Sequence, residues 1–113
     1  MYERLMRLQI CWRCGVELMA KSIMQKDKKC CMCGGTQWLE EHHIFNGNPN
    51  RKLSEKYGLK VWLCHYCHNE PPHGIHHNAE NNRLLKATAQ EKAMQHYGWS
   101  IADFRKIFGK SYL

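Results

Sequence analysis

Seven cysteines in 113 residues constrain this chain more than any other feature, because six of them form three CxxC pairs. The pairs are Cys11 with Cys14, Cys30 with Cys33, and Cys64 with Cys67. A tetrahedral zinc ion binds four ligands, so two pairs must meet to close one structural site. The second and third pairs flank a strand-rich stretch and predict such a zinc site. With thiolate at all four positions, the site would stabilise the fold and do no chemistry.

The first pair, Cys11 and Cys14, has no comparable partner pair. Sequence reasoning leaves it as free thiols or as ligands of a second zinc, to which Cys31 would add a third thiolate. An exchange, in which this pair takes Cys30 and Cys33 as its partners, stays open as well. The N-terminus has no unbroken apolar core before a cleavage site, which argues against secretion and favours metal binding over disulfides.

Length and charge narrow the class of protein further. The chain fits one small domain, expected at residues 30–113, after an N-terminal extension of residues 1–29 with the first CxxC pair. No run of 18 apolar residues is present to cross a bilayer, so we expect a cytoplasmic protein without a membrane partner. Seventeen Lys and Arg against ten Asp and Glu give a formal charge of +7. That excess favours nucleic acid as the partner.

Strand and helix patterns alternate along residues 36–64. The stretch "TQWLEEHHIF" predicts a strand that pairs as a hairpin after a turn at Gly34 and Gly35. "NPNRKLSEKYGL" predicts a loop and a short helix that ends near Gly58. "LKVWLC" predicts a second strand. Together with the helical segments that follow, the pattern indicates the α+β class.

Two further helices are expected at the C-terminal end. The first runs from Glu80 to Tyr97, with Gly98 ending it, and its apolar face holds Leu85, Ala89, Ala93 and Tyr97. The second begins after Ser100, which forms a capping box with Asp103. Its expected apolar face consists of Ile101, Phe104 and Phe108. The four tryptophans are expected in the core more than on the surface.

Seven of the eight histidines lie between residues 42 and 77, beside carboxylates and cysteine pairs. This clustering predicts a second metal site. His42 and His43 are adjacent on the expected strand, where neighbouring side chains point to opposite faces. One imidazole can therefore bind a cation while the other stays available as a base, an arrangement suited to phosphodiester hydrolysis.

The stretches "CCMCGGTQWLEEHHIF", "LKVWLCHYCHN" and "GIHHN" resemble the HNH endonucleases, zinc-containing ββα-metal nucleases of bacteria and phages. The likeness covers residues 30–113 and extends to small HNH proteins of phage and prophage origin. It implies a small ββα-metal core stabilised by a four-cysteine zinc site, with additional C-terminal helices. The implied activity is metal-dependent cleavage of DNA that leaves a 3′ hydroxyl and a 5′ phosphate.

The resemblance also implies roles for individual histidines. His42, His68 and His76 would be ligands of a catalytic divalent cation, and His43 would be the general base. Pro72 lies one helical turn after His68, so the chain must loop outward before His76 returns. His73 and His77 are the rivals for the third ligand, and we expect His73 to face solvent. Magnesium is the expected cation, although such ligands also admit Mn, Ni or Zn.

Supporting residues follow from the same comparison. Members of the family often have an asparagine where this chain has Leu59, so another group must orient His43. Asn69, Asn46 or a main-chain carbonyl are the candidates, and Glu40 or Glu41 would hydrogen-bond a ligand imidazole. DNA phosphates would be contacted by basic residues, chiefly Arg51, Lys52, Lys56 and Lys60, with Lys26, Lys28 and Lys29 nearby.

Two alternatives remain beside the nuclease interpretation. One is a catalytically inactive, zinc-stabilised module that binds nucleic acid. The other is an interaction module whose C-terminal helices dock onto a partner. A homodimer, or assembly into a phage DNA-processing complex, is compatible with each of these functions.

Overall fold

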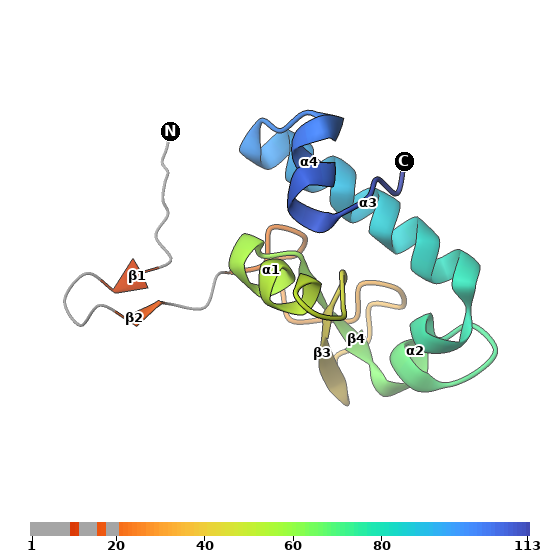
Figure 1. The fold of residues 1–113 in the computed structure, drawn as a ribbon. Helices are drawn as coiled ribbons and strands as arrows, with labels where there is room; N and C mark the ends of the chain where they lie inside the picture. Colours follow the sequence, from red (N-terminus) through yellow and green to blue (C-terminus); the bar gives the residue numbers. More distant parts are fainter. Residues whose placement is uncertain (1–9, 12–15, 18–20) are drawn as a thin grey trace.

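The computed structural model describes residues 10–11, 16–17 and 21–113 (Figure 1). Near the N-terminus, β1 (Ile10–Cys11) pairs antiparallel with β2 (Val16–Glu17). The predicted choice between free thiols and a second zinc at Cys11 and Cys14 lies outside the described side chains. None of the described helices is long and apolar enough to cross a membrane.

A two-stranded antiparallel sheet forms the centre of the domain. β3 (Leu39–His43) pairs with β4 (Lys60–Cys64), with Leu39 opposite Cys64 and His43 opposite Lys60. This confirms the α+β class and both predicted strands. The predicted hairpin at Gly34 is wrong, because the partner of β3 lies beyond a helix and not before the turn. Gly34, with a φ of 79°, instead forms the turn that follows Cys30 and Cys33, the second cysteine pair, and its N–H donates to the Cys30 carbonyl at 2.8 Å.

The helix α1 (Asn50–Tyr57) connects the two strands and ends at Gly58 as predicted. Gly58 has a φ of 72°, and a Cβ there would lie 2.3 Å from the Lys21 carbonyl oxygen, so only glycine fits. Residues 21–25 run along the outer edge of β4, where the Ser22 hydroxyl donates to the Lys60 carbonyl at 2.6 Å. The side-chain oxygen of Gln25 accepts from the Trp62 N–H at 2.7 Å.

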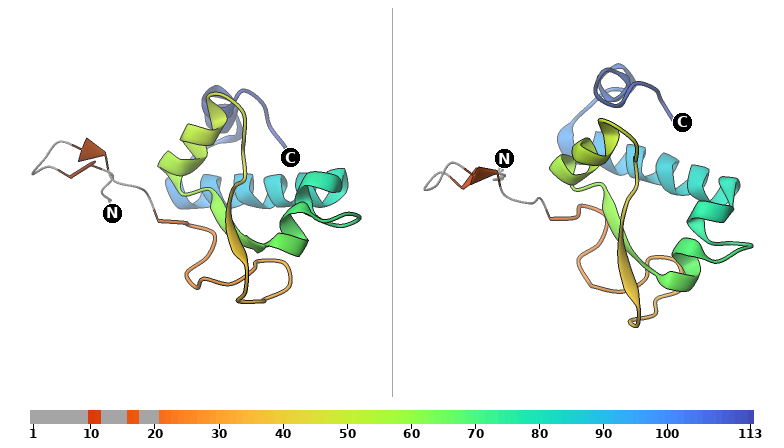
Figure 2. Two further views of the ribbon diagram at one scale, coloured as in Figure 1. Left: turned by 90° about the horizontal axis from the view of Figure 1, so that it is seen from below. Right: turned by 60° about the horizontal axis from the view of Figure 1, so that its bottom comes forward.

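The remaining helices follow β4. They are α2 (His65–Asn69), the 3₁₀ turn η2 (Ile75–His77), α3 (Ala79–Tyr97) and α4 (Ile101–Phe108). Figure 2 shows α3 passing beside the sheet. The stop at Gly98 and the capping box of Ser100 and Asp103 are confirmed.

The core lies between the sheet and the C-terminal helices. Phe45 contacts Phe104, Phe108 and Tyr112, with ring centres 4.8–5.4 Å apart. The Ser54 hydroxyl donates to the Phe45 carbonyl at 2.6 Å and accepts from the Phe45 N–H at 3.0 Å. These bonds join the end of β3 to α1, and so hold His43 close to the side chains of that helix.

Two expectations about apolar side chains are wrong. Ile101 is 47% exposed, so the buried face of α4 is formed by Phe104 and Phe108. Trp38 is 81% exposed and has a φ of 53°, whereas Trp62 and Trp99 are partly buried. No local pattern indicates this difference, because a short apolar run before a strand does not reveal which residue turns outward.

Candidate metal centres

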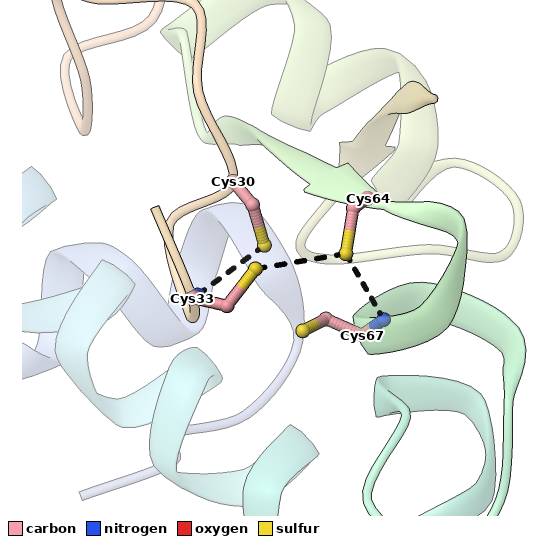
Figure 3. Close-up of side chains that lie close together, drawn as sticks. All are labelled: Cys30, Cys33, Cys64 and Cys67. Atoms are coloured by element: carbon pink, nitrogen blue, oxygen red, sulfur yellow. Dashed lines mark hydrogen bonds between the residues drawn. The ribbon is translucent and has the colours of Figure 1, made fainter. Parts of the chain in front are cut away.

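The four cysteines of the second and third CxxC pairs form one cluster (Figure 3). Their sulfur atoms all lie within 4.8 Å of one another, and those of Cys33 and Cys64 are 3.8 Å apart. Thiolates bound tetrahedrally at about 2.3 Å from zinc would be separated by about 3.8 Å. The cluster is therefore compatible with the predicted structural zinc.

Backbone N–H groups point at these sulfur atoms. The Cys33 N–H donates to Cys30 Sγ at 3.5 Å, and the Cys67 N–H donates to Cys64 Sγ at 3.4 Å. Burial opposes ionisation of Cys30, but hydrogen bonds from three backbone groups lower its pKa to about 6. Burial and the neighbouring thiols raise the pKa of Cys67. The pKa of Cys30 is thus lowered while that of Cys67 is raised, and a bound cation would favour the thiolate form of all four cysteines.

His73 lies beside the cysteine cluster and not in solvent, so that expectation is wrong. Its Nε2 is 3.9 Å from Cys67 Sγ, and its ring packs edge-on against Tyr66 with centres 4.5 Å apart. Its carbonyl accepts from the Asn81 side chain at 2.9 Å. The loop after α2 folds back onto the third cysteine pair, Cys64 and Cys67, which sequence spacing could not show.

A second cluster joins three histidines from different elements. His42 comes from β3, His68 from α2 and His76 from η2, and one ring nitrogen of each lies within 4.8 Å of the others. The Nε2 atoms of His68 and His76 are 2.9 Å apart. The predicted outward loop is present between α2 and η2, and it returns His76 to the cluster. Both His76 and His77 are exposed, but His77 is not a member of the cluster.

His42 provides a test of whether this cluster fits a cation. His42 is 3% exposed, and its Nε2 has no hydrogen-bond partner among the residues that the structure describes. Burial, followed by the charges of His68 and His76, lowers the pKa of His42 to about 3, so its ring is neutral near pH 7. A buried polar atom without a partner is costly. Coordination of a metal ion would satisfy this nitrogen, so the three side chains fit a cation.

Glu40 supports the cluster from behind, as predicted for a carboxylate near the histidine pair. Its Oε1 lies 2.7 Å from His68 Nδ1 and accepts from the Asn69 side chain at 2.7 Å. Its Oε2 lies 3.1 Å from Nδ1 of the exposed His65, whose Nε2 is 2.9 Å from Glu70. Hydrogen bonds from His68 and His65 lower the pKa of Glu40. An ionised Glu40 favours the His68 tautomer whose Nε2 lone pair faces the cluster.

The neighbouring His43 has a different partner from those predicted. Its Nε2 lies 2.7 Å from Oε1 of Glu55 on α1. The proposal that Asn69 or Asn46 orients His43 is therefore wrong, since Asn69 donates to Glu40 and Asn46 is exposed. Leu59 is fully buried in the core. One signal was available, because Glu55 is the only acidic residue between positions 44 and 59.

Lys60 also departs from its predicted role as a DNA contact. It is 6% exposed, and its Nζ lies 2.7 Å from Glu55 and 3.4 Å from Glu41. The acidic groups of Glu41 and Glu55 with His43 have the spacing of a cation site. The Lys60 ammonium pairs with both carboxylates there, and Glu55 also contacts Nε2 of His43.

A cleft of about 210 Å³ joins the two histidines of β3. Its lining includes His42, His68 and His76 of the histidine cluster together with His43 and Arg51. Arg51, Lys52 and Lys56 are exposed on α1, which leaves their guanidinium and ammonium groups at the surface. The cleft thus brings together a cluster that fits a cation, the imidazole of His43 and positive charge.

Comparison with protein-family models, with curated proteins and with solved structures gives no match. The class is therefore defined by this geometry: a small α+β domain with a tetracysteine cluster and a cluster of three histidines.

Proposed function

We propose that this chain is a metal-dependent endonuclease that hydrolyses DNA phosphodiester bonds, with β3, β4 and α2 forming the ββα-metal unit of the HNH endonucleases. One observation carries the proposal. His42 and His43 are adjacent on one strand and line the same cleft. His42 belongs to the cluster that fits a cation, and the imidazole of His43 is held by the carboxylate of Glu55.

His42, His68 and His76 would hold the divalent cation. Two nitrogens bound at right angles, each about 2.1 Å from an octahedral ion, would lie about 3.0 Å apart. The 2.9 Å between the Nε2 atoms of His68 and His76 is close to this value. When bound, such an ion stabilises negative charge on the phosphate and on the leaving oxygen. Magnesium remains the expected ion, since it is the cation with the oxygen preference that phosphate requires.

His43 would be the general base. Glu55 accepts the hydrogen bond of the Nε2–H, which leaves the Nδ1 lone pair to take a proton from the attacking water. Although partial burial opposes it, hydrogen bonds from Lys60 and His43 lower the pKa of Glu55. Glu55 is then a carboxylate at neutral pH, and it would stabilise the imidazolium that forms.

The positive charge of α1 would bind the DNA backbone. Arg51 lines the cleft itself, and Lys52 and Lys56 follow it on the same exposed helix. Such contacts provide affinity without reading sequence.

The test is cleavage of plasmid DNA in Mg²⁺ or Mn²⁺ by the full chain and by a His43→Ala variant. Loss of general-base catalysis should lower the rate of nicking by about 10²–10⁴-fold. A matched control is His77→Ala, because His77 is an exposed imidazole outside the cluster. Equal nicking by the full chain and His43→Ala would contradict the proposal. Binding of DNA by folded protein without any cleavage would instead favour the inactive nucleic-acid-binding module.

A further inference from the structure

A second cavity, of about 440 Å³, adjoins the candidate active-site cleft. It lies between residues 21–26 and β4, and Lys21, Lys26, Lys60 and Trp62 are among the residues that line it. Glu41 lines both this cavity and the cleft. The two hollows are therefore neighbours on either side of one side chain.

The strand register places Glu41 and His43 of β3 on one face of the sheet with Lys60 and Trp62 of β4, whereas His42 belongs to the other face. Glu41 is opposite Trp62, and His43 is opposite Lys60. Directly opposed residues, and those two positions along a strand, share a face. A chain with its phosphate at His43 can therefore extend across Glu41 and reach Trp62 without passing around the sheet.

The chemistry of the cavity suits an anion that carries a flat ring. Lys21 and Lys26 are exposed, and the ammonium of Lys28 lies 4.6 Å from the ring centre of Trp62. The charge of Lys60 is matched by Glu55 and Glu41, so the positive excess comes from the lysines of residues 21–28. Aromatic side chains bordered by cations are the usual platform for the bases of single strands.

We propose that this cavity receives the nucleotide next to the scissile phosphate, with its base against Trp62 and its phosphate near Lys21 and Lys26. The inference rests on the proposed nuclease function and extends it to a class of substrate. A cavity of this size accepts a small molecule or a single nucleotide, and stacking on Trp62 requires a base whose face is free, as in an unpaired strand. The preferred substrate is therefore DNA with an unpaired strand at the cut.

The experiment measures binding apart from cleavage. A fluorescent single-stranded oligonucleotide is titrated, by anisotropy and without added divalent cation, into the full chain carrying His43→Ala. On that background, Trp62→Ala should weaken binding at least about tenfold, and Trp62→Phe should restore most of it. Lys21→Ala with Lys26→Ala should also weaken binding and reduce its salt dependence. Lys92→Ala with Lys106→Ala, which changes two exposed lysines of α3 and α4, is the matched control.

The results distinguish this inference from the proposed function. The inference is overturned if the variant with Lys21→Ala and Lys26→Ala binds the single strand as tightly as the control variant with Lys92→Ala and Lys106→Ala. It is also overturned if the protein binds a duplex of the same sequence as tightly as the single strand. Plasmid nicking by the unmodified chain would in that case still support the nuclease. A selective loss with the cavity variants supports the nucleotide site, and it does so even in the absence of nicking. Because Trp62 is partly buried, thermal unfolding is measured to show whether its variants remain folded. Lys21 and Lys26 are exposed, so their substitution gives a binding result that does not depend on the Trp62 variants.

Discussion

The cysteine cluster and the histidine cluster are neighbours that differ in their number of ligands and in their access to substrate. Cys67 and His68 are consecutive residues of α2, yet one belongs to each cluster. The cysteine cluster has four sulfur ligands and so leaves no position for substrate. The histidine cluster offers three ligand atoms and lines a cleft, so a cation held there as proposed would keep coordination positions for water and phosphate. One short helix thus contributes both to a closed cluster suited to structural zinc and to the proposed open site.

The largest expected effect comes from opening the closed site with Cys67→Ser. Structural zinc contributes roughly 10–16 kcal/mol in small zinc domains, which is as large as the entire stability of a typical domain. We expect the variant to lose cooperative thermal unfolding and most of its bound zinc. Circular dichroism and metal analysis measure both.

The matched control for this prediction is Cys31→Ser. Cys31 is exposed and lies outside the cluster, so its unfolding free energy should change by about 0.5 kcal/mol or less. If Cys31→Ser and Cys67→Ser unfolded at the same temperature as the unmodified chain, the cysteines would not hold a structural metal.

The next effect concerns the open site, where His42→Ala removes its buried ligand. The loss in affinity for Mn²⁺ should exceed the roughly 10–100-fold that the loss of an outer partner costs, because one of only three protein ligands is gone. The cysteine site and the fold should remain, in contrast to Cys67→Ser. Calorimetric titration with Mn²⁺ measures the affinity, with His77→Ala as the control. Unchanged affinity in His42→Ala would remove His42 from the ligand set.

A smaller loss of affinity for Mn²⁺ is expected at Glu40, which contacts the His68 ring and not the cation. Glu40→Gln keeps the shape of the side chain but replaces the carboxylate that faces His68 Nδ1 at 2.7 Å. We expect affinity for Mn²⁺ to fall about 10–100-fold. Glu70→Gln is the control, because Glu70 reaches only the exposed His65 through its carboxylate. A similar loss in both variants would indicate a general effect of surface charge.

Local signals explain what the sequence predicted well. The CxxC spacing, the alternation of the strands, Gly58, Gly98 and the capping box each act over a few residues, and each was confirmed. The gathering of His42, His68 and His76 was anticipated only through a family resemblance. The three histidines form no repeated paired motif comparable to CxxC, so their spacing alone does not indicate which of the eight histidines meet.

What the sequence missed depends on tertiary packing. Glu55 reaches His43 because the core bonds of Ser54 place α1 beside the end of β3. Lys60 was assigned to DNA because lysine is usually exposed, whereas here two carboxylates stabilise its buried ammonium. Both errors concern charged pairs that form between elements, where local patterns contain no information.

The smallest expected effect is the pH dependence of the unfolding free energy that His42 causes at the open site. The pKa of His42 is lowered from 6.5 to about 3 in the fold, so below pH 6.5 the unfolded chain binds a proton that the folded chain excludes. The stability that this neutral ring provides is complete above pH 6.5 and decreases as the pH falls towards 3. Moving from above pH 6.5 to about pH 5.5 should therefore cost about 1.4 kcal/mol.

Urea unfolding of the zinc-loaded protein, without a second cation, measures this loss between about pH 7.0 and about pH 5.5. The control is His42→Leu, which removes the titrating ring but keeps a buried side chain of similar size. Acid also competes for the cysteine thiolates, yet that effect is common to both proteins and cancels in the difference. We expect the unmodified chain to lose more stability than His42→Leu over this interval. Equal losses would mean that His42 is solvated, and that the cluster of three histidines lacks the dry, unpartnered nitrogen on which its contrast with the cysteine site depends.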